Sequence, residues 1–571
     1  MPEQSFMKSL FHGVIAEELI SPWPQPEGAE RDTIERLVGA VHRFGERVDS
    51  AAIDRERRIP AEDLRTLREL GVFGVTVPRE HGGLGLGRAA AARIVQELSG
   101  IDSSIALTVA AHQSIGLDGL LLFGTETQKR KYLPRLASGE WLGAFALTEP
   151  SAGSDAAAIQ TRAERAADGE GWILDGSKQW ITNGDVAEVF TMFARTSPAD
   201  EGVKPRLTAF VVERGHGVVS AEKSHTLGVR GAAPTPVSLR GARVPAGNVL
   251  GEVGRGFKVA TQVLDGGRVA LAAQCVGLCK RLIAMSVARC SERRAFGRAI
   301  GQFGLIKDKI ARMMVETFAL ESTLYATAGL VDGRIADWSI ESAICKILGS
   351  ETVWRVANEA VQIAAGAGYM ADQPWERLLR DARVHLVFEG TNETLRCFVA
   401  LAGMQGPGTE LADVVRAMRE PIKGFGLLSD FALRKARSAL SRERLHRVHP
   451  LLNKETVLFE EATVELARNV EKVLRKHGKE IAEMQYTQRR VADLAIDLFA
   501  LAACMSRTSR AIERKGEDGA RREIELTTAF AGYASERMTA NIRGFDRNED
   551  ELLKGIASRT YADGGYPFDI F

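Results

Sequence analysis

One glutamate stands in a sequence environment that suits acid–base chemistry. Glu389 lies in the stretch RVHLVFEGTNETLR, between the apolar residues 386–388 and the turn residue Gly390. A carboxylate between a buried apolar run and a tight turn has a partner or a task, because its charge is costly to remove from water. Two interpretations are open: the anion stabilises the N-terminus of the helix that begins at TNETLR, or it is a base kept out of water.

The whole-chain numbers describe a globular protein with no strong charge bias. The 571 residues predict about three or four domain-sized units, and 45% hydrophobic with 26% charged residues is typical of a soluble chain. Lys plus Arg (75) and Asp plus Glu (74) nearly cancel. This balance argues against a global nucleic-acid footprint, so no nucleic-acid partner is expected.

The cysteines and the N-terminus exclude several other classes. Cys275 and Cys279 are spaced to share one helix face, but no CxxC pair or His-rich set accompanies them. We therefore expect no metal site and reduced thiols in helix cores. The N-terminus carries early acids and lacks a signal-like apolar core, and no apolar run reaches the about 18 residues that span a bilayer. A soluble, cytoplasmic protein is expected, at most peripheral on the inner face of the membrane.

Periodicity divides the chain into helical and β regions that would position Glu389. Apolar residues at three- and four-residue spacing predict helices in the first quarter, short runs such as GWILDG and LTAFVVER predict strands in the second, and helical spacing then returns. PREHGGLGLGR is interpreted as a turn and GMQGPGTE as a helix break. The expected parts are an N-terminal extension (1–29), an N-terminal helical domain (30–140), a middle β domain (141–251), a helical bundle (252–405), a linker or membrane-associating helix (406–450) and an additional C-terminal helical domain (451–571).

Five motifs in this order resemble those of the acyl-CoA dehydrogenase family. FALTEPSAGSD (145–155) and GSKQWITNG (176–184) resemble its flavin-binding stretches, and ERRAFGR (292–298), QIAAGAGY (362–369) and FEGTNETLR (388–396) complete the set. The extra C-terminal unit makes the chain similar to the very-long-chain branch. The resemblance implies a mainly α fold: an N-terminal helical domain, a middle β-barrel domain and a C-terminal helical bundle, plus the additional helical domain.

The resemblance assigns Glu389 the role of base. A desaturase of acyl thioesters must remove the α-proton with a base and the β-hydride with a flavin, and a desolvated carboxylate suits the first task. The developing enolate needs donors, which in relatives are the backbone N–H of the base and a ribityl hydroxyl of the flavin. Periodicity alone leaves the helix-start interpretation equally good.

The resemblance also implies FAD and the residues that hold it. Seen in isolation, TEPSAGSD would be a polar turn, Trp180 a core residue and Arg293 a solvated helix arginine beside Glu292. Arg293, Phe296, Gln362 and Gly366 match positions that bind the flavin of a neighbouring subunit, so a homodimer is expected. The implied FAD-binding residues are Phe145, Leu147, Thr148, Gly153, Ser154, Trp180, Ile181, Thr182, Arg293, Phe296, Gln362, Gly366, Thr391 and Glu393.

Five residues are implied for substrate binding: Ser154, Asp265, Arg268, Gly390 and Ala111. Asp265 and Arg268 resemble residues that hold the CoA portion and the base loop, although Arg268 could instead form a local pair with Asp265. Ala111 matches the position at which medium-chain relatives close the pocket floor with a glutamate. A small residue there favours a long acyl chain. QFGLI at Phe303–Gly304 also departs from the medium-chain His-Gln and is similar to the very-long-chain branch.

The basic segment 431–449 has two interpretations. FALRKARSALSRERLHRVH has an apolar helical face and one acid, Glu443, which suits an interfacial helix on an anionic membrane. The alternative is a solvated linker.

The predicted function is FAD-dependent oxidation of long-chain acyl-CoA to trans-2-enoyl-CoA in fatty acid β-oxidation, with electron-transfer flavoprotein as acceptor. The alternatives are a dehydrogenase or oxidase for another acyl class, and an assembly or scaffold role on the same fold.

Overall fold

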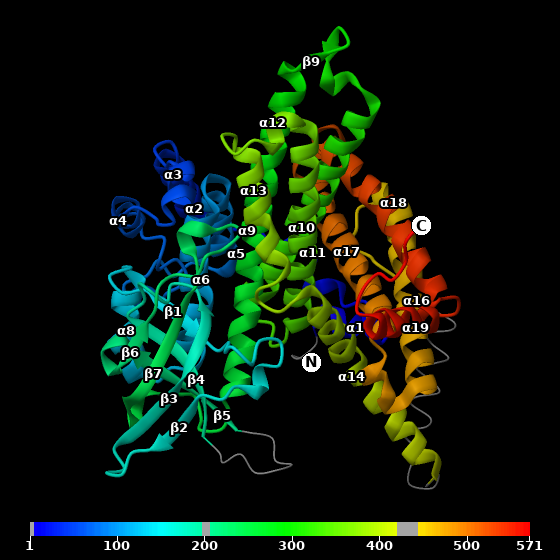
Figure 1. Ribbon diagram of the computed structural model, residues 1–571. Helices are drawn as coiled ribbons and strands as arrows, with labels where there is room; N and C mark the ends of the chain where they lie inside the picture. Colours follow the sequence, from blue (N-terminus) through cyan, green and yellow to red (C-terminus); the bar gives the residue numbers. More distant parts are fainter. Residues whose placement is uncertain (1–4, 197–205, 420–443, 571) are drawn as a thin grey trace. The chain divides into compact units, whose positions relative to one another are not determined.

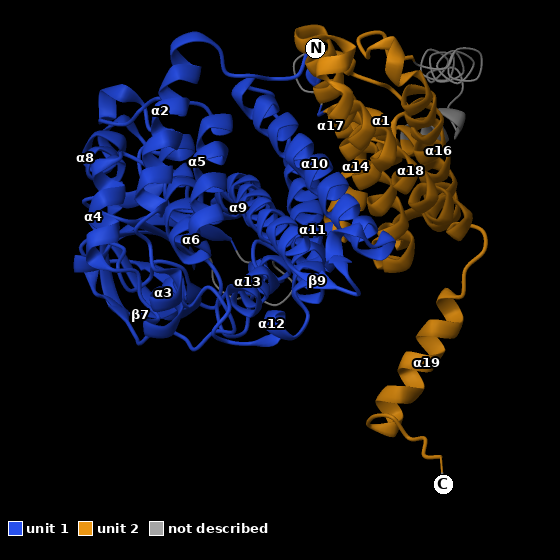
Figure 2. Ribbon diagram, turned by 90° about the horizontal axis from the view of Figure 1, so that it is seen from above, with its two compact units in different colours: residues 1–5, 19–395 blue, residues 6–18, 396–571 orange. Residues whose placement is uncertain are grey.

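The structure, a computed structural model, describes residues 5–196, 206–419 and 444–570. The chain forms two compact units, coloured separately in Figure 2. Unit 1 comprises residues 1–5 and 19–395, and unit 2 comprises residues 6–18 and 396–571. Every candidate site residue from the sequence lies in unit 1.

Unit 1 begins with a cluster of helices. Their shared core joins Val41, Phe73, Ile94 and Ile105. Asp102 starts α6 by accepting hydrogen bonds from the N–H groups of Ser104 and Ile105, as expected of an N-cap aspartate. The helices are α2 Gly28–Gly45, α3 Ser50–Glu56, α4 Ala61–Glu69, α5 Arg88–Ile101, α6 Ser103–Ala111, a π-helical turn His112–Gly116, α7 Asp118–Phe123 and α8 Glu126–Ala137. The glycine-rich stretch before α5 is a turn, as predicted.

The middle of unit 1 is one sheet of eight strands in the described residues, lower left in Figure 1. The order is β6-β7-β3-β2-β4-β5-β8, with β1 parallel to β4. Inward side chains from both ends of this path, such as Leu239 and Phe210, share one core. The sheet is therefore curved around its own core, and its hydrogen-bonded path stays open between β6 and β8 rather than closing as a full barrel. The strands are β1 Gly143–Ala146, β2 Arg162–Arg165, β3 Gly171–Ile181, β4 Val189–Arg195, β5 Leu207–Glu213, β6 Val218–Ser220, β7 Thr235–Pro245 and β8 Val249–Leu250.

Three long helices, α9, α10 and α11, form the bundle beside the sheet (Figure 1). Helix α9 is enclosed on several sides, because it packs against α5, α10 and α11. A short hairpin, β9 Arg294–Ala295 with β10 Arg298–Ala299, joins α9 to α10. The helices are α9 Gly256–Glu292, α10 Gly304–Asp332, α11 Ser339–Ala364, α12 Gly366–Tyr369, α13 Pro374–Arg383 and α14 Asn392–Arg419.

Two segments of unit 1 are long and apolar enough to cross a membrane by composition: Ser103–Phe123 and Gly256–Glu292. Their apolar windows are 78% and 72% buried inside the protein, which is how core helices behave. The free cysteines also lie in helices, and all but the half-buried Cys397 are buried, as the sequence predicted.

Unit 2 is an all-helical bundle in the described residues. Its elements are α1 Phe6–Phe11, most of α14, α16 Asn453–His477, α17 Gln485–Gly519, α18 Arg521–Gly544 and α19 Asp550–Asp563. The rings of Phe6 and Phe499 lie 5.9 Å apart in its core. Residues 6–18 thus belong to this bundle rather than to a separate N-terminal extension.

The predicted helix break at GMQGPGTE (403–410) is wrong, because α14 continues through Pro407 to Arg419. The glycines there serve close packing instead. A Cβ on Gly403 would lie 2.2 Å from the Phe11 ring, so only glycine admits α1 at this point. The domain of 406–450 therefore begins as helix rather than as a linker.

The basic segment 431–449 falls mostly outside the described residues. Its last part, 444–449, is not helical. The N–H groups of His446 and Arg447 instead donate to the buried carboxylate of Glu17, at 2.8 and 2.6 Å. The prediction of a helix that extends to His449 is therefore wrong, because these backbone N–H groups donate to a glutamate far away in the sequence.

Candidate active site

The loop that carries Glu389 is held in an unusual backbone conformation. After α13 ends at Arg383, one 3-10 turn follows, and Glu389 and Gly390 then both adopt positive φ, 58° and 92°. Positive φ in a residue other than glycine costs about 1–2 kcal/mol, so the surroundings must hold it. Thr391 then accepts a hydrogen bond from the N–H of Thr394 and caps the start of α14. The loop therefore both begins a helix and aims the Glu389 side chain.

One oxygen of the Glu389 carboxyl group is shielded from solvent and has no hydrogen-bond partner in the part of the chain that the structure describes. Glu389 is half-buried as a residue, but its Oε2 is buried and has no hydrogen-bond partner among the described residues. Burial raises the pKa of this carboxyl to about 7, and the nearby charges of Arg268 and Lys346 only partly oppose that rise. A carboxyl poised near neutral pH is the state expected of a general base.

Helix α9 makes room for that carboxyl group. A Cβ on Gly267 would lie 2.8 Å from Glu389 Oε2 and 2.8 Å from a methyl carbon of Ile115. Glycine at 267 thus allows the carboxylate to lie directly against the helix.

The predicted burial of the apolar run 386–388 is wrong. Val387 is 50% exposed, and Leu386 and Phe388 are half-buried. The 3-10 turn places His385 inward instead. The apolar run beside Glu389 is thus partly open to solvent, and the carboxyl group lies against Gly267 of α9.

Arg268 contacts both partners that the sequence offered it. Its Nη1 donates to Asp265 at 2.8 Å, and its Nε donates to the backbone carbonyl of Glu389 at 3.3 Å. Ser342 on α11 also donates to Asp265 at 3.0 Å. Burial raises the pKa of Asp265 to about 6, against the effects of Arg268 and Ser342. The local pair and the contact with the base loop therefore coexist.

A buried lysine that the sequence analysis did not single out lies on the other side of the loop. Lys346 on α11 donates to the carbonyl of Gly390 at 2.7 Å and to Asn392 Oδ1 at 2.8 Å. The sequence signal that could have found it is a lone lysine among the apolar and small residues of SAICKILGS, which predicts a buried charge.

The first flavin-like motif leaves β1 at the centre of the sheet. Phe145 and Leu147 are buried, Thr148 is half-buried, and Gly153 and Ser154 are exposed in the following turn. A Cβ on Gly153 would meet nothing within 4 Å. The carbonyl of Thr148 accepts from the N–H of Gln179, which joins this motif to the second one on β3.

A buried ion pair fixes the same turn. Glu149 and Lys178 are 4% and 1% exposed, and their Oε1 and Nζ lie 2.7 Å apart. The N–H groups of Gln160 and Thr161 also donate to Glu149. These interactions lower the pKa of Glu149 although burial opposes them, while burial lowers the pKa of Lys178 to about 8. Both groups are therefore charged at neutral pH.

The second flavin-like motif ends β3 with an irregular turn. Trp180 has φ 58° and is 58% exposed, so it is not a core residue. The register of β3 on β7 shifts between Lys178 and Ile181, which turns the indole outward. Ile181 is buried and Thr182 is half-buried.

Helix α6 links the two halves of the site. Asn183, next to Thr182, donates to the carbonyl of Thr108 at 3.1 Å. Phe388, next to Glu389, packs against the cluster that contains Leu107. Adjacent residues of one helix thus support the end of β3 and the base loop.

The residues expected to reach a neighbouring subunit lie on the surface of unit 1. Arg293, Gln362 and Gly366 are exposed, and Phe296 is 94% exposed at φ 51° in the β9–β10 hairpin. Thr391 is half-buried and Glu393 is exposed on the first turn of α14. In the described single chain, Phe296 contacts the ring of Phe303.

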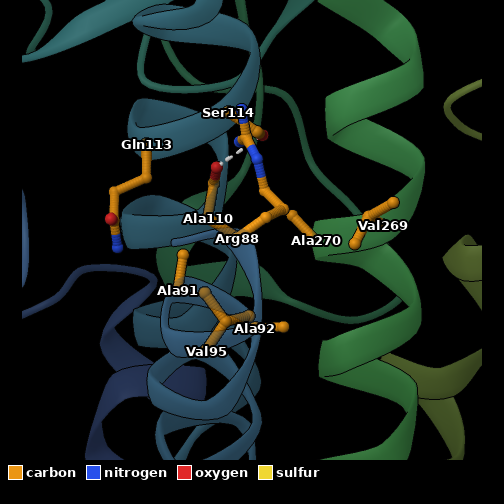
Figure 3. A pocket seen from close by; sticks show the side chains of 9 residues that line it. All are labelled: Arg88, Ala91, Ala92, Val95, Ala110, Gln113, Ser114, Val269 and Ala270. Atoms are coloured by element: carbon orange, nitrogen blue, oxygen red, sulfur yellow. Dashed lines mark hydrogen bonds between the residues drawn. The ribbon is translucent and has the colours of Figure 1, made fainter. Parts of the chain in front are cut away.

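A small cavity lies between α5, the α6–π turn and α9 (Figure 3). Its lining is mostly alanine and valine, and it also includes the half-buried Arg88 and the buried Gln113: Arg88, Ala91, Ala92, Val95, Ala110, Gln113, Ser114, Val269 and Ala270. On α9 it begins two residues after Gly267. Ala111, expected at a pocket floor, is buried but does not line this cavity, whereas Ala110 does.

Models of four known domains match the chain in order. The acyl-CoA dehydrogenase N-terminal domain matches residues 31–140, its middle domain 144–242, and its C-terminal domain 254–404. The chain belongs to the acyl-CoA dehydrogenase family. A fourth model, the ACAD9/ACADV C-terminal domain, matches residues 450–566.

Full-length relatives agree with this assignment. The human very long-chain specific acyl-CoA dehydrogenase, a mitochondrial protein, is 42% identical over 97% of this chain and 86% of its own length. An acyl-CoA dehydrogenase from Bacillus anthracis, solved with FAD, covers 96% of this chain and 94% of its own, at 29% identity and TM-score 0.79. Butyryl-CoA dehydrogenase from Megasphaera elsdenii covers 66% of this chain and 99% of its own, at 33% identity and TM-score 0.63.

The protein is thus an acyl-CoA dehydrogenase, an FAD-dependent enzyme that dehydrogenates fatty acyl-CoA. The residues at the two flavin-like motifs fit that cofactor. An outward indole, a half-buried hydroxyl at Thr148 and an open glycine turn at Gly153 are suited to an aromatic ring and a pyrophosphate. The described residues contain no group of three His, Cys, Asp or Glu side chains placed to hold a metal ion.

Proposed function

We propose that this acyl-CoA dehydrogenase oxidises long-chain fatty acyl-CoA to trans-2-enoyl-CoA in fatty acid β-oxidation, with Glu389 as the base. The observation that carries the proposal is the state of the Glu389 carboxyl group. Its Oε2 is shielded from solvent and has no hydrogen-bond partner among the described residues, and its pKa is raised to about 7. Such a group is ready to accept a proton from a substrate placed against it.

The chain's own residues would bind and orient the thioester. Glu389 takes the α-proton at its carboxylate, and FAD, when bound, supplies the acceptor for the β-hydride. The positive φ of Glu389 and Gly390 turns the loop toward the substrate side, and the backbone N–H of Glu389 is the donor we assign to the thioester oxygen. Asp265 and Arg268 hold this loop and the CoA portion. Ser154 contributes to both flavin and substrate binding.

The remaining flavin contacts would come from the two motifs and the start of α14 in this chain, and from residues of a second chain. Phe145, Leu147, Thr148, Gly153 and Ser154 would contact the flavin from the first motif, and Trp180, Ile181 and Thr182 from the second. Thr391 and Glu393 contact it from the start of α14.

We also propose a homodimer in which Arg293, Phe296, Gln362 and Gly366 contact the flavin of the partner subunit. The 94% exposure of Phe296 supports this, since a phenyl ring so placed is costly to leave in water.

A long acyl chain is supported by the cavity beside α9. On α9 its lining starts at Val269, two residues after the glycine that faces Glu389, and most of the lining is small and apolar. Chain length is therefore set near Ala110 and Ala111, where bulk would shorten the available space. The very long-chain relatives carry a name consistent with this preference.

Electrons are expected to pass to an electron-transfer flavoprotein, and the protein is expected to be cytoplasmic. Peripheral membrane contact through residues 431–443 would bring it to membrane-borne substrate. Co-sedimentation with anionic liposomes, with and without residues 425–443, tests this contact; equal sedimentation of both proteins would contradict it.

The deciding experiment for chain length is anaerobic mixing of the holoenzyme with acyl-CoAs of graded length, followed by flavin bleaching. Tetradecanoyl- to octadecanoyl-CoA should bleach the flavin fastest. Ala110→Leu should lower the ratio of palmitoyl- to octanoyl-CoA bleaching rates, because it fills the cavity, while octanoyl-CoA serves as the internal control. Bleaching by short or branched acyl-CoA alone would contradict the long-chain proposal.

A further inference from the structure

Two cations, the half-buried Arg268 and the buried Lys346, hold the base loop. Arg268 on α9 binds the carbonyl of Glu389, and Lys346 on α11 binds the carbonyl of the next residue, Gly390. Lys346 has no exposed surface at all. Burying an ammonium group costs several kcal/mol unless its donors are satisfied, so this lysine is expensive and its contacts need explanation.

The partners of Lys346 are all parts of the loop that follows Glu389. Its Nζ reaches Gly390 O at 2.7 Å and Asn392 Oδ1 at 2.8 Å. Asn392 is itself buried, and its side chain is oriented by Ser350 at 3.0 Å and by Glu351 at 3.2 Å. One turn of α11 therefore fixes both the carbonyl after the base and the first residue of α14.

Lys346 does not serve as a direct counter-ion for the base. Glu389 Oε2 has no hydrogen-bond partner among the described residues, although the lysine is near enough for its charge to oppose the rise of the Glu389 pKa. A lysine that formed an ion pair with the carboxylate would lower its basicity. Binding the adjacent backbone leaves the carboxylate free for substrate.

We propose that Lys346 is a positioning residue, whose ammonium fixes the backbone after Glu389 and so keeps the carboxylate aimed at the substrate. The inference rests on the proposed function, since it assumes that Glu389 is the base. Its two charge-assisted hydrogen bonds oppose the strain of the left-handed backbone at Glu389. Without them, the loop has less reason to keep this conformation.

The charged and titratable groups around Lys346 come from three elements and the base loop. Cys275 and Arg268 face it from α9, Glu393 from α14, and Glu389 from the loop. On its own helix, Glu351 reaches it only through Asn392. Removing the ammonium therefore removes a positive charge near Glu389 as well as two hydrogen bonds.

The test compares the Lys346→Met holoenzyme with wild type and with Lys309→Met. Methionine matches the length of the lysine stem and is tolerated in cores. Lys309 of α10 forms an ion pair with Glu359 of α11 and contacts no residue of the site. Its substitution therefore controls for the loss of a lysine at α11. Flavin bleaching by palmitoyl-CoA is measured anaerobically from pH 5.5 to 9, together with product binding from the flavin spectrum.

The expected result has two parts. The limiting rate fitted above the acid limb, which belongs to ionised Glu389, should be at least about tenfold lower in Lys346→Met, because a misplacement of about 1 Å costs up to a hundredfold. The midpoint of the acid limb should also move to higher pH, since the carboxylate loses a nearby cation. Product affinity should change less than threefold, and Lys309→Met should match wild type in all readouts.

Three outcomes would overturn the inference. One is a lower melting temperature with an unchanged limiting rate of bleaching, which would indicate a merely structural role. Another is a shifted acid limb with a normal limiting rate, which would indicate a purely electrostatic role. If Lys346→Met does not fold, Asn392→Ala, which removes one lysine contact, should show the same changes at smaller size; its equality with wild type would also overturn the inference.

Failure of the proposed function gives a different pattern. If Glu389→Gln keeps wild-type bleaching, Glu389 is not the base, whatever Lys346 does. If Glu389→Gln is inactive and Lys346→Met is fully active, the base assignment holds and only the positioning role fails.

Discussion

Among the described residues, two buried lysines, Lys178 and Lys346, lie near a glutamate, and they are arranged in opposite ways. In the flavin-binding turn, Lys178 binds the Glu149 carboxylate directly at 2.7 Å. At the base loop, Lys346 donates to the backbone carbonyl that follows Glu389 and forms no hydrogen bond with Glu389 Oε2. The pKa of Glu149 is accordingly lowered, whereas that of Glu389 is raised to about 7.

The difference teaches that the identity of buried residues does not decide their role. A lysine on the carboxylate makes a fixed ion pair, which supports a turn. A lysine on the neighbouring carbonyl fixes the direction of a carboxylate that stays available for a proton. The following predictions test this contrast by changing the two glutamates in the same way.

The largest effect is expected from Glu389→Gln. Amide in place of carboxylate removes the proton acceptor, so the rate of flavin bleaching by palmitoyl-CoA should fall by about a thousandfold. FAD content, measured from the visible spectrum of the purified protein, should stay at the wild-type level because the flavin turn is untouched. Turnover equal to wild type would contradict the assignment of the base.

Glu149→Gln should damage the fold and the flavin site rather than the chemistry. Removing one partner of a buried pair leaves Lys178 uncompensated, at a cost of about 3–5 kcal/mol. The variant should unfold at lower urea concentration and retain less FAD. The double variant Glu149→Gln with Lys178→Met is the matched control and should recover part of the lost stability, because it buries no charge. A normal FAD content and midpoint in Glu149→Gln would show that the pair does not support the turn.

Sequence reasoning predicted most of the fold, but not how the residues of the candidate site are held. Helical spacing and turn residues were enough to separate the helical and β regions, because these patterns depend on neighbours in the chain. Glu389 was singled out, but the apolar run expected to cover it is itself partly exposed, with Val387 50% exposed, and the carboxyl group lies against Gly267 of α9. That contact joins residues over a hundred positions apart, and no local pattern reports it.

The same limit explains the other differences. Lys346 was missed because its partners lie more than forty residues along the chain. The helix break predicted around Pro407 was also wrong. There α14 packs against Phe11 at Gly403, and Phe11 lies at the opposite end of the sequence. Ala111, which the sequence predicts at the pocket floor, is buried next to Ala110, the alanine that lines the cavity.

A smaller effect concerns stability and its dependence on pH. The pKa of Glu389 is raised on folding, so the folded state binds its proton more tightly, and ionisation of the carboxyl group destabilises the fold as pH rises from about 4.5 to about 7. Glu389→Gln removes this penalty. The holoenzyme variant should therefore melt a few degrees above wild type at pH 8, and the difference should shrink at pH 5. A difference that is independent of pH would contradict the raised pKa.

The central claim is that Glu389 is a desolvated base, and the pH dependence of anaerobic flavin bleaching tests it most directly. With limiting palmitoyl-CoA, the apparent second-order rate constant of the wild-type enzyme should fall tenfold per pH unit below a midpoint of about 7, the value to which burial raises the Glu389 pKa. A rate constant that stays flat down to pH 5 would contradict the claim, because it would mean that the group removing the α-proton has an ordinary carboxylate pKa or is not Glu389.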